Sequence, residues 1–120
     1  MCLFWAVPAC TVAPDQEVRL RVMSYNVKHG LAMTKRPIRS NLEIQAAILR
    51  EQRADLIGLQ EIDQGCKRSG GLDQTGLFAS LTGMNGAFGK FMDYDGGRYG
   101  LALLSRFPTS DVETVALPPG

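Results

Sequence analysis

The chain has 120 residues, of which 45% are hydrophobic and 13 are glycine, so its length and composition fit one modest globular domain rather than two. The same composition argues against a disordered chain, a collagen repeat or a coiled coil. With 13 basic and 12 acidic residues the net charge is +1, which excludes a global field strong enough to attract nucleic acid or an acidic membrane. Any charged ligand must therefore be held by local groups.

An apolar segment, MCLFWAVPACTVA, opens the chain and is too short to span a bilayer. We divide the sequence into this segment, residues 1–17, and a domain over residues 18–120. The segment lacks a basic start, yet small residues near Cys10 and Ala13 suit cleavage or lipid attachment, so a clipped secretory signal is one interpretation. A disordered start or an extra apolar edge segment is the other. The first implies a secreted or cell-envelope protein, the second allows a cytoplasmic one.

The three cysteines, Cys2, Cys10 and Cys66, are too few and too scattered to form a disulfide framework or a zinc knuckle.

Alternating hydrophobicity from Val18 through Leu20 and Val22 predicts a half-buried strand. Continued alternation places Ser24 and Asn26 on the same face. A loop follows, and its basic residues Lys35, Arg36 and Arg39 are typical of a solvated loop that an anionic ligand can still approach. Ser40 to Glu43 has the pattern of a capping box, which predicts a helix from there to about Arg53.

The apolar run from Asp55 to Glu61 predicts a strand buried on both faces, with Ile57, Leu59 and Glu61 on one side. The sequence of residues 73–83 predicts a short helix that a glycine ends.

Two further strands are predicted, Ala87 to Tyr94 and Tyr99 to Arg106, joined by a tight Asp-Gly turn at residues 95–97. Asp111 to Leu117 is expected to add one more strand. This order of elements indicates an α/β protein with a mixed β-sheet and helices on one side.

Polar side chains appear where two of the predicted strands end, Asn26 in SYN and Glu61 in LQE. Ligands of open α/β sheets bind at such carboxyl edges. A carboxylate on an apolar strand must be paired, protonated or bound to a cation. Magnesium fits because it takes one or two carboxylates and fills its other positions with waters and phosphates. A solvated strand end or a pair with Arg68 are the alternatives for Glu61.

Read together, the segments SYNVKHG, ADLIGLQEID and GGRYGLALLSRFP resemble the endonuclease/exonuclease/phosphatase family of magnesium-dependent phosphodiesterases, nucleases and phosphatases, over about Val22 to Pro108. The resemblance implies the N-terminal half of a four-layered α/β/β/α sandwich. It also implies a metal-dependent hydrolase of phosphoester bonds, with Mg²⁺ as cofactor and Mn²⁺ as a possible substitute. Its substrates would be nucleic acids, inositol phosphates or phospholipid head groups.

By the same resemblance, Glu61 is a magnesium ligand, and Asn26 is the active-site asparagine that contacts the metal site or the scissile phosphate. We therefore expect both residues to be catalytic and metal-binding. Arg68 is expected to contact a substrate phosphate or to be a surface charge. Tyr99 is expected to reach the phosphate or to pack in the hairpin. His29 is interpreted as a loop residue near the site.

The catalytic set is incomplete in this sequence, which contains a single histidine, no Asp-x-Asn motif and no Ser-Asp-His motif. We expect the chain alone to be inactive unless a second polypeptide or another copy completes the site.

A half sandwich would leave one apolar sheet face without a partner layer. The residues expected on that face are Val18, Leu20, Val22, Ile57 and Leu59. The alternative function is therefore a non-catalytic binding or assembly module that self-associates or pairs with a complementing chain through this face.

Overall fold

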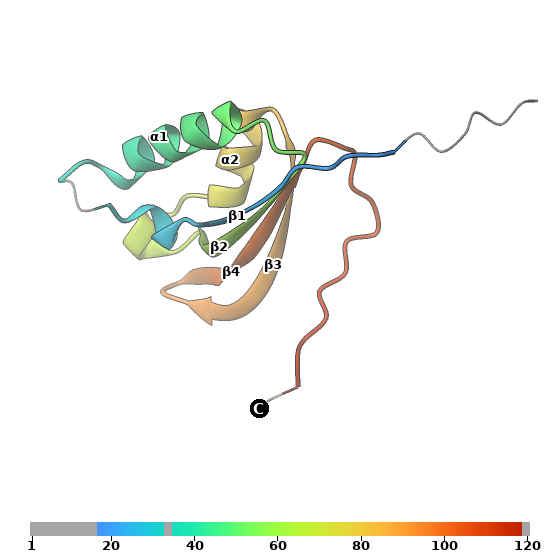
Figure 1. Ribbon diagram of the computed structural model, residues 1–120. Coiled ribbons are helices and arrows are strands. Elements are labelled where there is room, and N and C mark those ends of the chain that lie inside the picture. Colours follow the sequence, from blue (N-terminus) through green and yellow to red (C-terminus); the bar gives the residue numbers. More distant parts are fainter. Residues whose placement is uncertain (1–16, 33–34, 119–120) are drawn as a thin grey trace, which may run out of the picture.

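The computed structural model describes residues 17–32 and 35–118, which form one four-stranded sheet with two helices packed on one of its faces (Figure 1). In chain order the elements are β1 (Val22–Asn26), the 3-10 turn η1 (Lys28–Gly30), α1 (Ile38–Glu51), β2 (Leu56–Gln64), the 3-10 turn η2 (Lys67–Ser69), α2 (Gln74–Thr82), β3 (Asn85–Tyr94) and β4 (Gly97–Ser105). The predicted α/β class with a mixed sheet and helices on one side is confirmed. Apart from Glu17, the segment 1–17 lies outside the described residues.

The strands are ordered β1-β2-β4-β3 across the sheet. β1 pairs parallel to β2, in a register that sets Asn26 opposite Gln60, and the other two pairings are antiparallel. β3 and β4 are joined by Asp95 and Gly96, whose φ angles of 46° and 80° are both positive. Such a two-residue turn matches the natural twist of paired strands, so the expected tight Asp-Gly hairpin is confirmed.

Helix α1 begins at Ile38, so the prediction of a capping box at Ser40 and Glu43 is wrong. Pro37 precedes the first helical residue, and no side chain caps this end. The proline ring fixes φ near the helical value, so the chain can enter the helix directly after it, and Ser40 then lies inside the first turn. At α2, by contrast, the predicted helix and its glycine stop at Gly83 are confirmed, and the Asp73 side chain caps the first turn by accepting a hydrogen bond from the Gly76 amide.

The core lies between the sheet and the helices, and it corrects the prediction for the exposed face. Ile57 and Leu59 of β2 are 0% and 1% exposed because they point toward the helices. From β1, Met23 and Tyr25 pack on this core, whereas Val22 is 67% exposed on the open face. Alternation identified which residues share a face, but it could not show which face the helices cover.

Val18 and Leu20 are exposed and precede β1, which begins only at Val22. No helix of the described residues is both long enough and apolar enough to cross a membrane.

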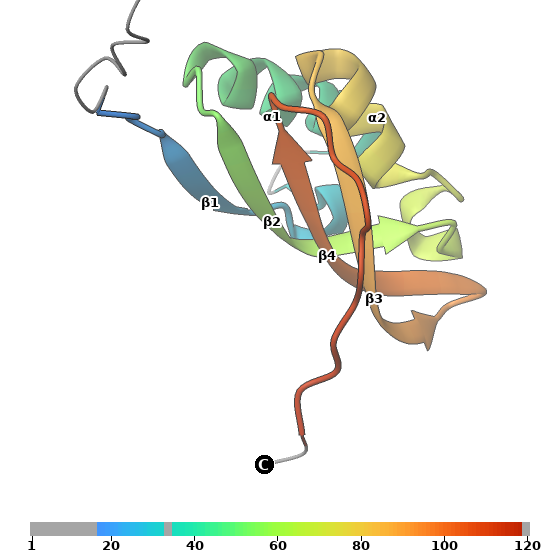
Figure 2. The ribbon, with the colours of Figure 1, turned by 90° about the vertical axis from the view of Figure 1, so that its right-hand side faces the viewer.

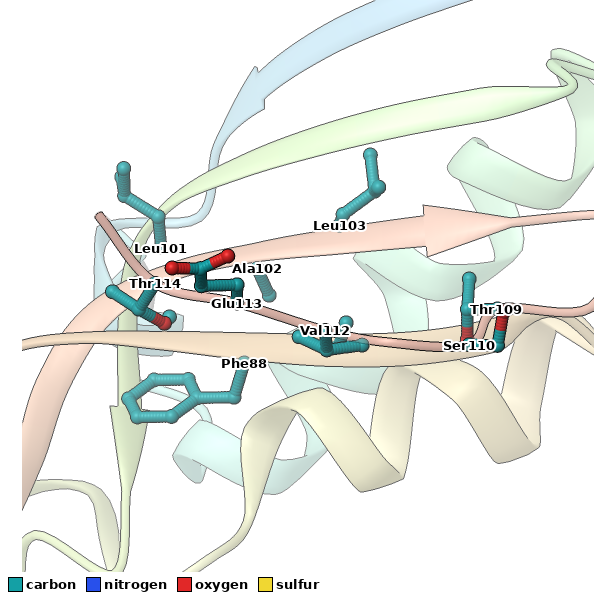
Figure 3. A pocket seen from close by; sticks show the side chains of 11 residues that line it. Phe88, Leu101, Ala102, Leu103, Thr109, Ser110, Val112, Glu113 and Thr114 are labelled. Atoms are coloured by element: carbon teal, nitrogen blue, oxygen red, sulfur yellow. The ribbon is translucent and has the colours of Figure 1, made fainter.

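The open face of the sheet carries apolar side chains on β4, where Leu101 and Leu103 are 56% and 42% exposed. The chain after β4 runs across this face beside β3 and β4 (Figure 2). Val112 and Thr114 come from this stretch, and together with the strands they line a hollow of about 420 Å³ (Figure 3). The expected strand over residues 111–117 is not formed, because the stretch makes no ladder hydrogen bonds with its neighbours.

Phe78 is the largest fully buried side chain of the core and holds α2 on the sheet. We expect Phe78→Ala to lower the free energy of unfolding by about 3–5 kcal/mol, because truncation removes buried apolar area and leaves a cavity. Urea denaturation followed by circular dichroism measures the change. Phe91→Ala is the matched control, since Phe91 is 77% exposed and should cost little. Equal losses in the two variants would contradict the core described here.

Candidate active site

Glu61 lies at a β-bulge in the interior of β2, so the prediction that the strand ends at this residue is wrong. Leu59 pairs with Ala102 and Ile62 with Gly100, which leaves one extra residue on β2 between these pairs. Glu61 has a φ of 57°, in the left-handed region. Simple alternation would put Glu61 on the core side with Leu59. The bulge returns Ile62 to the core instead and turns the Glu61 side chain out of it.

The structure brings Glu61 and Asn26 together, as the sequence predicts. Asn26 is the last residue of β1, and parallel pairing with β2 sets it beside the bulge. Its Nδ2 donates a hydrogen bond of 2.8 Å to Glu61 Oε1, and its Oδ1 accepts one of 2.8 Å from the Lys28 amide. The amide therefore fixes one carboxylate oxygen, while Oε2 accepts no hydrogen bond from the described residues.

His29 lies in the turn after β1 with a φ of 43°, and its carbonyl accepts a 2.9 Å hydrogen bond from Gln74 Nε2. Its Nδ1 is 4.0 Å from Glu61 Oε2 and is buried without a hydrogen-bond partner among the described residues. Burial and then the nearby charge of Arg68 lower the pKa of His29 below its ordinary value, although Asp63 and Glu61 oppose them. The imidazole at this position is therefore held in its neutral form.

Arg68 is paired with Asp63, and not with Glu61. Its Nε and Nη2 donate hydrogen bonds of 2.9 and 2.7 Å to the two oxygens of Asp63, a carboxylate that is 0% exposed. Burial by itself raises the pKa of Asp63, but hydrogen bonds from Arg68 and Ser69 and the arginine charge outweigh it, so the pKa lies below its usual value. The same pairing raises the pKa of Arg68. Arg68 is thus neither a solvated surface charge nor a mobile one.

Two tyrosines flank the guanidinium of Arg68, whose central carbon lies 4.3 Å from the ring centre of Tyr94 and 5.4 Å from that of Tyr99. Burial, and then the charge of Glu61, raise the pKa of Tyr99. These side chains join Glu61 around a hollow of about 220 Å³. Its lining residues are His29, Glu61, Arg68, Met92, Tyr94 and Tyr99.

Sequence reasoning missed Tyr94 and Met92, although a signal for them existed. The predicted Asp-Gly turn pairs the strands on either side of it, and the observed register sets Met92 opposite Tyr99 and Tyr94 opposite Gly97. Counting outward from the turn would have placed both residues near Tyr99.

The donor set around Glu61 can be tested against a magnesium ion. Among the described residues no group of three histidine, cysteine, aspartate or glutamate side chains converges as a metal site. One carboxylate with a free oxygen does fit an ion that takes its remaining ligands from water and substrate phosphate. Asn26 presents its nitrogen to Glu61, and its oxygen is used by Lys28, so in this arrangement it orients the carboxylate.

We expect Asp63→Asn to lower the free energy of unfolding by about 3 kcal/mol near neutral pH, because it leaves the Arg68 charge partly buried and unpaired. The pKa of Asp63 is lowered from 3.8, so the stability it contributes is present above that pH and is lost as the pH falls through its folded value. The difference between variant and wild type should therefore shrink in acid. Urea denaturation at a series of pH values measures it.

Asp93→Asn is the control, since Asp93 makes an exposed pair with Lys90 that contributes little. A difference between wild type and Asp63→Asn that stayed constant below pH 3.8 would contradict the assigned pairing.

Comparison with known proteins identifies the family of the chain and a similar fold. A model of the Endonuclease/Exonuclease/phosphatase family matches residues 23–120. A solved structure of an endonuclease/exonuclease/phosphatase from Beutenbergia cavernae DSM 12333 is similar, with a TM-score of 0.52 and 19% identity over 78% of this chain. The present chain covers 27% of the length of the Beutenbergia cavernae protein. The comparison with curated proteins found no match for the present chain. Since the family match spans most of its residues, the chain belongs to the endonuclease/exonuclease/phosphatase family.

Proposed function

We propose that this chain forms one side of the active site of a divalent-metal-dependent phosphoester hydrolase, in which Glu61 and Asn26 are the catalytic and metal-binding residues. The observation that carries the proposal is the bulge in β2, which directs Glu61 out of the core and against Asn26, beside the hollow. A left-handed glutamate costs about 1–3 kcal/mol, and backbone strain of this kind concentrates at functional sites.

Glu61 would hold Mg²⁺, or Mn²⁺ as a substitute, through the carboxylate oxygen that Asn26 leaves unoccupied. When bound, the ion neutralises the phosphate and stabilises the charge that develops on the leaving oxygen. Asn26 keeps the carboxylate in one orientation through its hydrogen bond, and its Oδ1, which accepts one hydrogen bond from the Lys28 amide, has a second lone pair with which it would bind the ion.

Arg68 and Tyr99 would bind the phosphate of the substrate. Asp63 uses two nitrogens of the guanidinium, and Nη1 makes no hydrogen bond to the described residues. The stacking on Tyr94 and Tyr99 keeps the guanidinium plane fixed at the hollow, so its position needs little ordering when substrate binds. Nucleic acid, inositol phosphate and phospholipid head groups all present the phosphoester that these groups would contact.

The open face of the sheet supports the proposal that a second layer completes the site. Leu101 and Leu103 are half-exposed there, and exposed apolar patches of this kind mark interaction surfaces. A complementing chain or another copy would cover them. If this association proved to be the whole function, the chain would be a binding or assembly module without catalysis.

We expect Glu61→Gln to abolish the binding of Mg²⁺ to the 120-residue chain, because the amide removes the one negative charge facing the ion. Isothermal titration calorimetry measures it. Glu43→Gln is the matched control, since Glu43 is an exposed glutamate on α1 that pairs with Arg39 and should leave binding unchanged. Binding that survives Glu61→Gln would refute the assignment of the metal to this carboxylate.

We expect magnesium-dependent hydrolysis of a model phosphodiester, bis(p-nitrophenyl) phosphate, when the chain is joined to the remaining part of a family domain, and none from the 120 residues alone. In the joined protein Glu61→Gln should lower kcat by about a hundredfold or more. Robust turnover by the pure 120-residue chain would contradict the proposal. A chain that dimerises equally well with and without metal, and that binds no metal, would favour the assembly module. Size-exclusion chromatography measures this dimerisation.

A further inference from the structure

Two polar atoms without partners face each other at the edge of the hollow. Glu61 Oε2 and His29 Nδ1 are 4.0 Å apart, which is too long for a direct hydrogen bond. Nδ1 is buried and unsatisfied, a condition that costs about 1–3 kcal/mol unless a ligand or water fills it. Asn26 holds the other carboxylate oxygen of Glu61, and Gln74 holds the backbone of His29 through its carbonyl.

The backbone aims both side chains at this spot by a conformation that is rare outside glycine. His29 has a φ of 43° and Glu61 one of 57°. Each such residue costs free energy, and these two come from different elements and bring their side chains to within 4.0 Å of each other.

The gap suits a single atom bonded to both groups. Metal bonds to imidazole nitrogen and to carboxylate oxygen are each about 2.0–2.2 Å long, so an octahedral ion that binds both atoms in adjacent positions would need them to approach each other by about 1 Å. We propose that His29, through Nδ1, is a second ligand of the cation that Glu61 holds, and that it makes the site prefer Mn²⁺ to Mg²⁺. This inference rests on the proposed function, because it takes Glu61 as the first ligand.

The preference follows from the chemistry of the donor. Magnesium takes oxygen ligands and gives up its waters reluctantly, whereas first-row transition ions accept an imidazole nitrogen. A site with Glu61 alone would not distinguish the two ions strongly. A site with one carboxylate oxygen and one imidazole nitrogen would bind Mn²⁺ more tightly than Mg²⁺.

The test uses the fact that His29 is the only histidine of the 120 residues. Electron spin echo envelope modulation detects ¹⁴N bound directly to Mn²⁺, so wild-type chain saturated with Mn²⁺ should show an imidazole coupling that changes when the histidine is labelled with ¹⁵N. No substitution is needed for this measurement. Mn²⁺ is preferred to Zn²⁺ as the probe because Cys2 and Cys10, which lie outside the described residues, would bind the softer ion.

Affinity measurements give the second arm. His29→Ala should weaken Mn²⁺ binding about tenfold and Mg²⁺ binding by less than about threefold. Arg50→Ala is the control, because Arg50 is an exposed basic residue in the last turn of α1 and does not line the hollow. It should change neither affinity. Circular dichroism verifies that both variants remain folded.

The role of His29 and the assignment of the metal to Glu61 are overturned by different results. Mn²⁺ binding that requires Glu61 but shows no imidazole coupling, with His29→Ala unchanged, would overturn the role of His29 and leave the metal assignment standing. Mn²⁺ binding unaffected by Glu61→Gln would overturn the proposed function itself, and the inference with it.

Discussion

The hydrogen bond from Asn26 to Glu61 is the contact on which the site depends, and it exists only because β2 carries a bulge. The parallel pairing of β1 and β2 brings the two residues to the same level of the sheet. Without the extra residue, Glu61 would follow Leu59 into the core, where an unpaired carboxylate costs several kcal/mol. The bulge moves the Glu61 carboxylate from the core to the hollow, and the backbone of Glu61 adopts an unfavourable left-handed conformation as a result.

The ion pair between Asp63 and Arg68 is the second contact that fixes the site. Asp63 is fully buried two residues after Glu61, and it fixes Arg68 through two hydrogen bonds. The tyrosines of the hairpin stack on the same guanidinium, so the β3–β4 turn and the turn after β2 are joined at one cation. Arg68 also receives a backbone constraint, since its amide donates to Asp95 of that hairpin turn at 2.6 Å. These contacts together hold the guanidinium and the two tyrosine rings in place at the wall of the hollow.

Local signals in the sequence predicted local structure well. The Asp-Gly turn, the α2 helix with Asp73 and Gly83 at its ends, and the fold class were all predictable, since each depends on residues close together in the chain. The start of α1 was mistaken because Pro37 competes with the apparent capping box. The face that Ile57 occupies, the bulge at Glu61 and the partner of Arg68 were not predictable from alternation. Each of them depends on contacts with residues distant in the sequence, and the alternation of hydrophobic and polar residues carries no information about those contacts.

Three consecutive residues of β2 have three different destinations: Glu61 toward the hollow, Ile62 into the core and Asp63 toward Arg68. The distance between the Glu61 carboxylate and the guanidinium that Asp63 anchors is therefore set by a fixed number of strand residues rather than by a loop. A single insertion or deletion between Leu59 and Asp63 would consequently exchange buried and exposed side chains and remove both contacts at once.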